Sequence, residues 1–221
     1  MALKKKPVTG MKDILPEEMK IRDYVISVIK ETYGKFGFTP IETPCVEHIE
    51  NLNSKQGGEN EKLIFKVLKR GEKLKLEEAK EENDLVDSGL RYDLTVPLVR
   101  FYSNNANDLP SPFKALQIGS VWRADRPQRG RYRQFYQCDI DIIDRDELNI
   151  AYDAEVLAVI YTIFNKLELP AFKIYLNNRK LLSGFLESLN IADKTVDVLR
   201  LVDKIKKIPE AAFLGELQDM G

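Results

Sequence analysis

The sequence predicts an α+β fold in which an antiparallel sheet is flanked by helices. Two strong strand patterns, residues 113–122 and 131–143, follow one another across a short polar loop, as in an antiparallel hairpin. Two longer segments, 16–36 and 148–168, carry apolar residues at helical spacing. Neither Gly-x-Gly-x-x-Gly nor a Walker A pattern occurs, so the two commonest nucleotide-binding folds are not supported.

The elements before the hairpin are expected to be short apart from the first helix. Pro16-Glu17-Glu18 marks its start, because proline suits the first turn and acidic residues favour the positive end of the helix dipole. Strands are expected at 38–42 and 62–68, and the charge-rich segment 69–87 is expected to be a solvated loop or short helix.

A further strand is expected at 89–94, and Thr95 then has the character of a helix N-cap with Pro97 in the first turn. That helix is expected to run to about Tyr102. After the helix 148–168, the expected elements are a strand at 172–176, a helix at 178–189 and a helical last segment, 193–221.

Composition narrows the chemistry that the chain can perform. Its 221 residues suffice for one large domain or two small ones, and they include one histidine, His48, and two cysteines. This set lacks a two-histidine metal site and a structural zinc site, so no protein-bound metal is expected. No apolar run is long enough to span a bilayer, and a cytoplasmic protein that makes no membrane contact is expected.

The hairpin loop concentrates positive charge in a chain whose net charge is −1. It holds one acid, Asp125, against five arginines: Arg123, Arg126, Arg129, Arg131 and Arg133. Arginine binds phosphate and carboxylate groups with two parallel hydrogen bonds, so an anionic ligand is one interpretation of the cluster. The other is a solvated turn with charged flanks.

The strand after the loop places unlike groups on its two faces. One face carries Arg133, Phe135, Gln137, Asp139 and Asp141, whereas the other is mostly apolar and suits the core. An aromatic ring among polar groups favours a ligand platform over an exposed sheet edge. Phe135 suits stacking on a flat base, and Gln137 and Asp141 suit binding a polar substrate.

A register for the hairpin follows if 124–130 forms the loop. Arg123 then pairs with Arg131, and Gly119 lies opposite Phe135. The missing side chain at Gly119 would leave room there for a bound ring.

The segment Leu90-Arg-Tyr-Asp-Leu-Thr-Val-Pro-Leu adds a third polar element. Arg91, Asp93 and Thr95 alternate to a single face if it is a strand. Asp93 is suited to receive an ammonium group with the Thr95 hydroxyl beside it. An exposed Arg91–Asp93 pair and a simple cap at Thr95 explain the same residues.

These segments resemble the histidyl-tRNA synthetase family of the class II aminoacyl-tRNA synthetases. Residues 119–141 are similar to motif 2 over its full length, and residues 90–98 to the family's histidine-binding segment. Three further segments resemble the family: 9–16, with Thr9 where a basic residue is usual, the motif 1-like region 16–44, and 176–184.

The resemblance implies a class II antiparallel sheet, a homodimer, and a two-step reaction in which ATP activates L-histidine and the histidyl group moves to tRNA(His). Mg²⁺ would accompany ATP as part of the substrate complex. By this resemblance, Arg123 binds the α-phosphate and the histidine carboxylate. The nucleotide side would also include Asp125, Arg131 and Phe135, and the histidine side Asp93, Leu94, Thr95, Gln137 and Asp141.

The family's later signatures do not occur in these 221 residues: motif 3, the second histidine-binding segment and the anticodon-binding domain. The sequence is therefore expected to be a truncated catalytic core, 1–177, followed by the start of a helical insertion domain, 178–221, with little activity alone. The alternatives are a histidine-sensing paralog, such as the regulatory subunit of ATP phosphoribosyltransferase, and an RNA-binding domain that uses the arginine loop.

Overall fold

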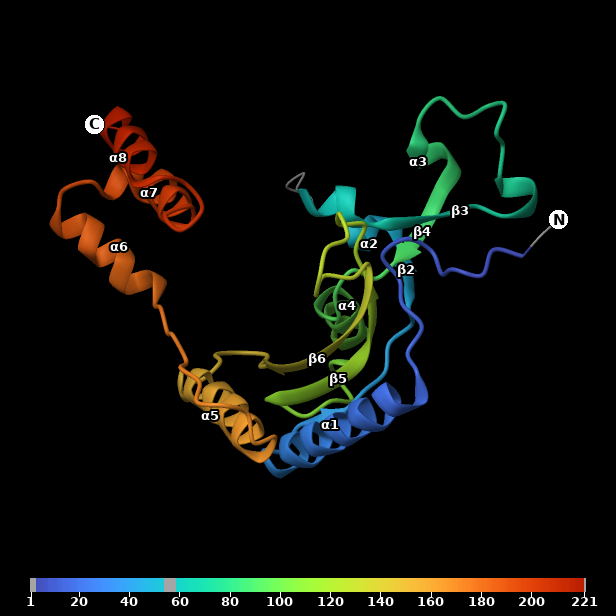
Figure 1. Cartoon of the computed structure of the whole chain (residues 1–221), viewed down its shortest axis with the longest axis horizontal. Coiled ribbons are helices and arrows are strands. Elements are labelled where there is room, and N and C mark those ends of the chain that lie inside the picture. Colours follow the sequence, from blue (N-terminus) through green and yellow to red (C-terminus); the bar gives the residue numbers. More distant parts are fainter. Residues whose placement is uncertain (1–2, 54–58, 221) are drawn as a thin grey trace. The chain divides into compact units, whose positions relative to one another are not determined.

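The structure is a computed structural model that describes residues 3–53 and 59–220, and the chain divides between Leu169 and Pro170 into two compact units. The helices are α1 (Pro16–Lys35), α2 (Ile49–Leu52), α3 (Glu82–Leu85), α4 (Thr95–Asn105), α5 (Ala151–Lys166), α6 (Arg179–Ser188), α7 (Thr195–Val202) and α8 (Glu210–Asp219). The strands are β1 (Thr39–Pro40), β2 (Val46–His48), β3 (Phe65–Leu68), β4 (Val86–Leu90), β5 (Phe113–Trp122) and β6 (Gln134–Ile143). Figure 1 shows these elements.

The first unit is built on the expected antiparallel hairpin. β5 and β6 pair along their full lengths, from Phe113 opposite Ile143 to Trp122 opposite Gln134. β1 adds to the other edge of β5 in parallel, and a second antiparallel sheet has the order β2-β4-β3. The α+β prediction is therefore confirmed.

Helices cover both faces of the β1-β5-β6 sheet (Figure 1). On one face, Leu116 of β5 packs with Ile29 of α1 and Val159 of α5 in a buried cluster. On the other face, Leu98 of α4 packs on Phe113 at the start of β5. The remainder of that second face carries the polar side chains of the site described below, together with Val121 and Phe135.

Some boundaries differ from expectation because pairing partners decide them. Segment 172–176 is not a strand, and it belongs to neither sheet of the described residues. β4 covers 86–90 instead of 89–94, since the chain turns into α4 after Leu90. β6 begins at Gln134 rather than at 131, because the Arg133 amide donates to Gly10 O at 2.7 Å instead.

The second unit consists of α6, α7 and α8 with a short 3₁₀ turn, Ala192–Lys194. Asn178 caps α6, because its side-chain oxygen accepts a hydrogen bond from the Lys180 amide at 2.8 Å. The last segment is helical as expected, with α8 starting directly after Pro209. Within residues 3–53 and 59–220, no helix has the length and apolar character that crossing a membrane requires.

Candidate active site

The polar face of β6 gathers carboxylates beside the start of α4. Burial raises the pKa of Asp139, and the nearby charges of Asp141 and Asp93 raise it further. Burial also raises the pKa of Asp141, again with a contribution from Asp93. Asp139 and Asp141 alternate onto the same face of β6, and the charge of Asp93 acts on both. This acidic cluster favours a cationic or hydrogen-bond-donating ligand.

Asp139 was not among the predicted site residues, although the period-two pattern had placed it on the correct face. It accepts a hydrogen bond from Gln137 Nε2 at 3.2 Å, which fixes the amide of that glutamine. The Gln137 Oε1 atom is buried, and no partner for it occurs in the described part of the chain. A ligand donor such as an ammonium group would satisfy this oxygen.

Asp93 and Thr95 reach the site differently from the prediction. Strand β4 ends at Leu90, so Arg91, Asp93 and Thr95 do not share a strand face. Thr95 is not the N-cap of α4, because that position is Leu94. Asp93, one residue earlier, accepts a hydrogen bond on Oδ1 from the Val96 amide in the first turn at 3.1 Å. Thr95 is exposed as the first residue of the helix, whereas Leu94 is 1% exposed.

Arg91 is not part of an exposed pair with Asp93. It is 5% exposed, and its side chain donates to the carbonyl oxygens of Thr43 at 2.7 Å and Ser120 at 3.0 Å. Its guanidinium also occupies the space in front of Gly119, where a Cβ atom would overlap Arg91 Nη2. The room that the sequence predicted for a bound ring is therefore filled by protein.

The predicted hairpin register is wrong by two residues. Gly119 lies opposite Gln137, and Phe135 lies opposite Val121. The Arg123 amide donates to Arg133 O at 2.8 Å, so the loop closes two residues later than expected.

Arg123 lies between the acidic cluster and an open pocket. Its Nε donates to Tyr92 O at 2.9 Å, and its Cζ lies 5.2 Å from the centre of the Phe135 ring. The pocket measures about 360 Å³ and is lined by Arg123, Asp125, Gly130, Arg131, Tyr132 and Phe135. It therefore combines cations with an aromatic face, which suits an anionic ligand that carries a flat ring.

The loop around this pocket is held from two directions. Arg131 and Asp125 form an ion pair at 3.4 Å, and Arg133 Nε donates to Asp125 O at 2.9 Å. Gly10, at φ +84°, lies against the same loop, and a Cβ there would come within 2.8 Å of Arg133 and Pro127. The N-terminal segment therefore supports the loop, which explains a glycine at this position.

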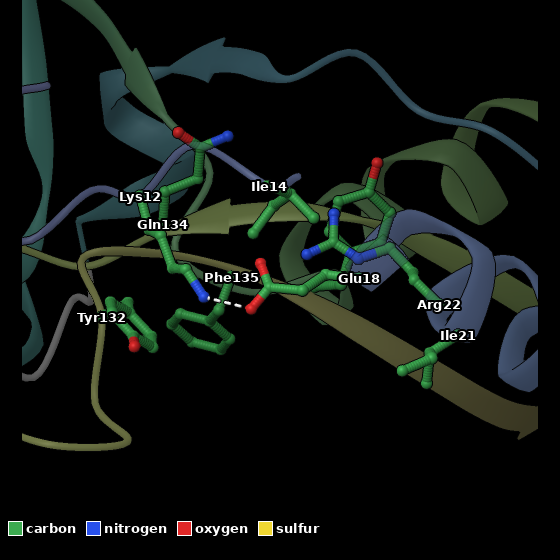
Figure 2. A pocket seen from close by; sticks show the side chains of 9 residues that line it. Lys12, Ile14, Glu18, Ile21, Arg22, Tyr132, Gln134 and Phe135 are labelled. Atoms are coloured by element: carbon green, nitrogen blue, oxygen red, sulfur yellow. Dashed lines mark hydrogen bonds and ion pairs between the residues drawn. The ribbon is translucent and has the colours of Figure 1, made fainter. Parts of the chain in front are cut away.

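A second pocket is lined by residues of α1 and, like the first, by Tyr132 and Phe135. It measures about 360 Å³, and Lys12 and Glu18 form an ion pair across it at 2.6 Å (Figure 2). The Arg22 guanidinium lies 4.7 Å from the centre of the Tyr136 ring. Lys12 and Glu18 thus already pair with each other, whereas Gln137 Oε1 in the acidic cluster has no partner in the described residues.

The sheet, the arginine-bearing hairpin and the adjoining acidic cluster define the chain as part of a class II aminoacyl-tRNA synthetase catalytic domain. Within that class, residues 10–220 match the family model described as "Histidyl-tRNA synthetase", and the chain belongs to that family. It corresponds to the N-terminal portion of the family's catalytic domain.

Relatives with solved structures or curated names agree with this placement. The chain is 45% identical to a histidine–tRNA ligase of Xanthomonas oryzae pv. oryzae over 93% of its own length and 45% of the relative's. Against that of Porphyromonas gingivalis it is 43% identical over 96% of this chain and 48% of the relative. The crystal structure of histidyl-tRNA synthetase from Nostoc sp. PCC 7120 matches with a TM-score of 0.80 and 34% identity, covering 99% of this chain and 46% of that one.

The chain spans about half the length of the curated relatives it matches. A Bacillus halodurans structure described as an ATP phosphoribosyltransferase regulatory subunit/histidyl-tRNA synthetase matches with a TM-score of 0.62 but only 20% identity, over 91% of this chain and 57% of that one. At that identity the likeness concerns the fold alone.

Proposed function

We propose that the protein to which this chain belongs is a histidine–tRNA ligase, which activates L-histidine with ATP and transfers the histidyl group to tRNA(His). The observation that supports the proposal most directly is the place of Arg123. Its guanidinium lies over Phe135, beside a cationic pocket, and its charge acts on Asp139 in the acidic cluster. In this proposal, Arg123 therefore lies where the histidine carboxylate and the α-phosphate of ATP come together.

The first step needs positioning and charge neutralisation more than a protein nucleophile. In the proposed arrangement, Arg123 neutralises the α-phosphate and orients the histidine carboxylate that attacks it. Phe135 stacks on the adenine, and Arg131 with its partner Asp125 borders the nucleotide. Pyrophosphate then leaves, and histidyl-adenylate remains.

The acidic cluster is proposed to hold the amino acid. Asp93 and the unpartnered Gln137 Oε1 accept hydrogen bonds from the α-ammonium group, with Thr95 beside them and Leu94 forming the buried floor. Asp141 faces the imidazole ring. Half-buried carboxylates strengthen these interactions, because the surrounding medium screens them less than water does.

Mg²⁺ is proposed only as part of the ATP complex. In the described residues, no group of three or more histidine, cysteine or acidic side chains is arranged to hold a metal ion. The cation would therefore enter on the phosphates of ATP, where it neutralises charge during displacement.

A homodimer through α1 is part of the same proposal. Ile21 is 66% exposed and Tyr24 58% exposed on this helix, so apolar surface remains for a second copy of the chain to cover. Residues 178–221 are proposed to begin the family's helical insertion domain.

The direct test is histidine-dependent exchange of pyrophosphate into ATP, measured on this chain and on a protein extended to the relatives' full length. We expect exchange in the longer protein and little in the 221-residue chain. Histidine binding without exchange in the longer protein would indicate a histidine-sensing paralog instead. RNA binding with a steep salt dependence, and no binding of histidine, would indicate the RNA-binding alternative.

A further inference from the structure

A break in backbone pairing lies at the edge of the β1-β5-β6 sheet, directly beside the amino-acid site. β1 pairs with β5 only at Thr39 and Pro40, and the last backbone bond of this edge runs from the Ile41 amide to Leu116 O at 2.9 Å. Beyond it the two segments separate around a cavity of about 240 Å³.

The Arg91 side chain spans this break. Its Nε donates to Ser120 O of β5 at 3.0 Å, and its Nη1 donates to Thr43 O at 2.7 Å, with Pro44 O at 3.4 Å. The planar guanidinium thus makes the hydrogen bonds that a neighbouring strand would otherwise make. The shape of the group matters here, because an ammonium group lacks this fixed fork of donors.

Burying the charged Arg91 side chain at this position is energetically unfavourable. It is 5% exposed, and no acidic side chain pairs with it in the part of the chain that the structure describes. A buried cation held only by carbonyl and hydroxyl oxygens costs free energy that an apolar side chain would not. Stability alone therefore gives a weak reason for an arginine at this position.

The hydrogen bonds around Arg91 lead into the amino-acid site. The Arg91 carbonyl accepts from the Trp122 amide at 3.0 Å, which fixes the start of the segment 91–94 to β5. The end of that segment is fixed by Gln117, whose Nε2 donates to Leu94 O at 2.9 Å. Thr43 joins the two anchors, because its hydroxyl accepts from Arg91 Nη1 at 3.2 Å and donates to Gln117 Oε1 at 3.1 Å.

Two groups of the proposed site are presented by this anchored segment. Asp93 contributes its carboxylate to the acidic cluster, and the Tyr92 carbonyl accepts the hydrogen bond that fixes Arg123 Nε. Both sides of the reaction centre thus depend on how the segment 91–94 lies on β5.

We propose that Arg91 is a positioning residue that bridges β5 and the segment 43–44 and thereby sets the place of both Asp93 and Arg123. It touches neither substrate in this proposal, and it acts through the segment 91–94. The proposal rests on the function proposed above for Asp93 and Arg123. Gly119 is part of the same arrangement, because a Cβ atom at this position would displace the Arg91 guanidinium.

The first test needs no ligand and uses amide hydrogen exchange on the whole chain. The reporter is the Val96 amide, which donates to Asp93 Oδ1, and its protection is compared with that of the β6 amides. We expect Arg91→Met to lower the ratio by about tenfold, the scale of one lost buried hydrogen bond. Arg91→Lys retains the charge without the fork, and we expect the same loss.

A matched control separates positioning from general loss of stability. Leu116→Ala weakens the core on the opposite face of the sheet, so it should lower the protection of the Val96 amide and of the β6 amides by the same factor and leave the ratio unchanged. An unchanged ratio in Arg91→Met, or an equal change in Leu116→Ala, would overturn the proposal.

The second test asks whether Gly119 acts through Arg91. Gly119→Ala should lower the ratio by about tenfold in the wild-type background and by less than about twofold in the Arg91→Met background, because the clashing group is then absent. Gly184→Ala in α6 is the control, since nothing lies within 4 Å of a Cβ there. Equal effects of Gly119→Ala in both backgrounds would contradict the proposed coupling.

A third measurement distinguishes this inference from the proposed function. In the full-length protein, Arg91→Met should raise the KM for histidine and lower kcat for exchange, each by about tenfold, because Asp93 and Arg123 are both displaced. Normal exchange kinetics together with a lowered amide ratio would contradict the link to the reaction. If the wild-type full-length protein performs no exchange, the proposed function fails, and the amide ratio still decides what Arg91 positions.

Discussion

The two faces of the β5–β6 hairpin are formed by alternate residues of the same strands. One face packs apolar side chains, whereas the other buries carboxylates. Leu116 and its partner Ile140 face α1 and α5, where apolar side chains fill the space between sheet and helices. Asp139 and Asp141 face the other way, and burial raises the pKa of both.

The apolar face stabilises the folded state, whereas the polar face destabilises it. The apolar face gains from every side chain removed from water. On the polar face, the charges of Asp93 and Asp141 raise the pKa of Asp139, and Gln137 Oε1 has no partner in the described part of the chain. Such an arrangement destabilises the free protein, and a ligand that supplies positive charge and hydrogen-bond donors would relieve it.

The largest expected effect on stability comes from the apolar face. Leu116 is 3% exposed, and Leu116→Ala should lower the free energy of unfolding by about 3 kcal/mol through lost transfer free energy and a residual cavity. Urea unfolding monitored by far-ultraviolet circular dichroism measures this. Val99→Ala, at a residue that is 56% exposed, should cost less than about 0.5 kcal/mol. Equal losses in the two variants would contradict the assigned core.

The next effect concerns the polar side of the hairpin and leaves stability almost unchanged. In the full-length protein, Arg123→Ala should slow adenylate formation by about 10²-fold or more, the scale for losing a group that stabilises charge in the transition state. Pyrophosphate exchange gives the rate, and the unfolding midpoint should stay near the wild-type value. Arg129→Ala, in the same loop, is the control, and a comparable loss there would reject the special role of Arg123.

The two faces were predictable from the sequence because they depend on a local rule. Side chains of a strand alternate, so Phe135, Gln137 and Asp141 had to share a face once the strand was recognised. The long helices α1 and α5 were predictable for the same reason, since their periodicity lies within one segment.

What the sequence predicted wrongly depends on partners far along the chain. The hairpin register shifted by two residues because the loop closes between Arg123 and Arg133, and the Arg133 amide bonds to Gly10, far away in the sequence. The Gly119 space was assigned to a ligand because nothing local shows that Arg91 fills it. Segment 172–176 has the composition of a strand, but strand formation requires a paired backbone, which composition does not reveal.

A smaller effect separates the two roles of Asp93 on the polar face. Asp93→Asn keeps an oxygen that accepts from the Val96 amide, so stability should stay within about 0.5 kcal/mol, whereas Asp93→Ala should cost about 1 kcal/mol through loss of this hydrogen bond. Both variants should bind histidine more weakly, because both lose the charge. Calorimetric titration with histidine, beside urea unfolding, measures the two properties. Wild-type affinity in Asp93→Asn would contradict the ammonium assignment.

The smallest expected effect is the pH dependence that the acidic cluster imposes on stability. Because burial raises the pKa of Asp141 above its ordinary value of 3.8, the folded chain holds that proton more tightly than the unfolded chain does. Protons bound preferentially by the folded state make stability fall as the pH rises through this range. The contribution of Asp141 is therefore most favourable in acid and is lost from about pH 4 upward.

Asp141→Asn removes this penalty, so the variant should gain stability over the wild type as the pH rises from about 4 to about 7, by less than about 1 kcal/mol because solvent screens a half-buried group. The difference between the two proteins is the useful quantity, since carboxylates with lowered pKa, such as Glu18 and Asp84, contribute the opposite slope equally to both. Saturating histidine should reduce this gain, because the bound ammonium offsets the crowded negative charge that the substitution would otherwise relieve. A gain that grows when histidine is added would mean that the cluster does not receive a cation, and the polar face would then need a different ligand.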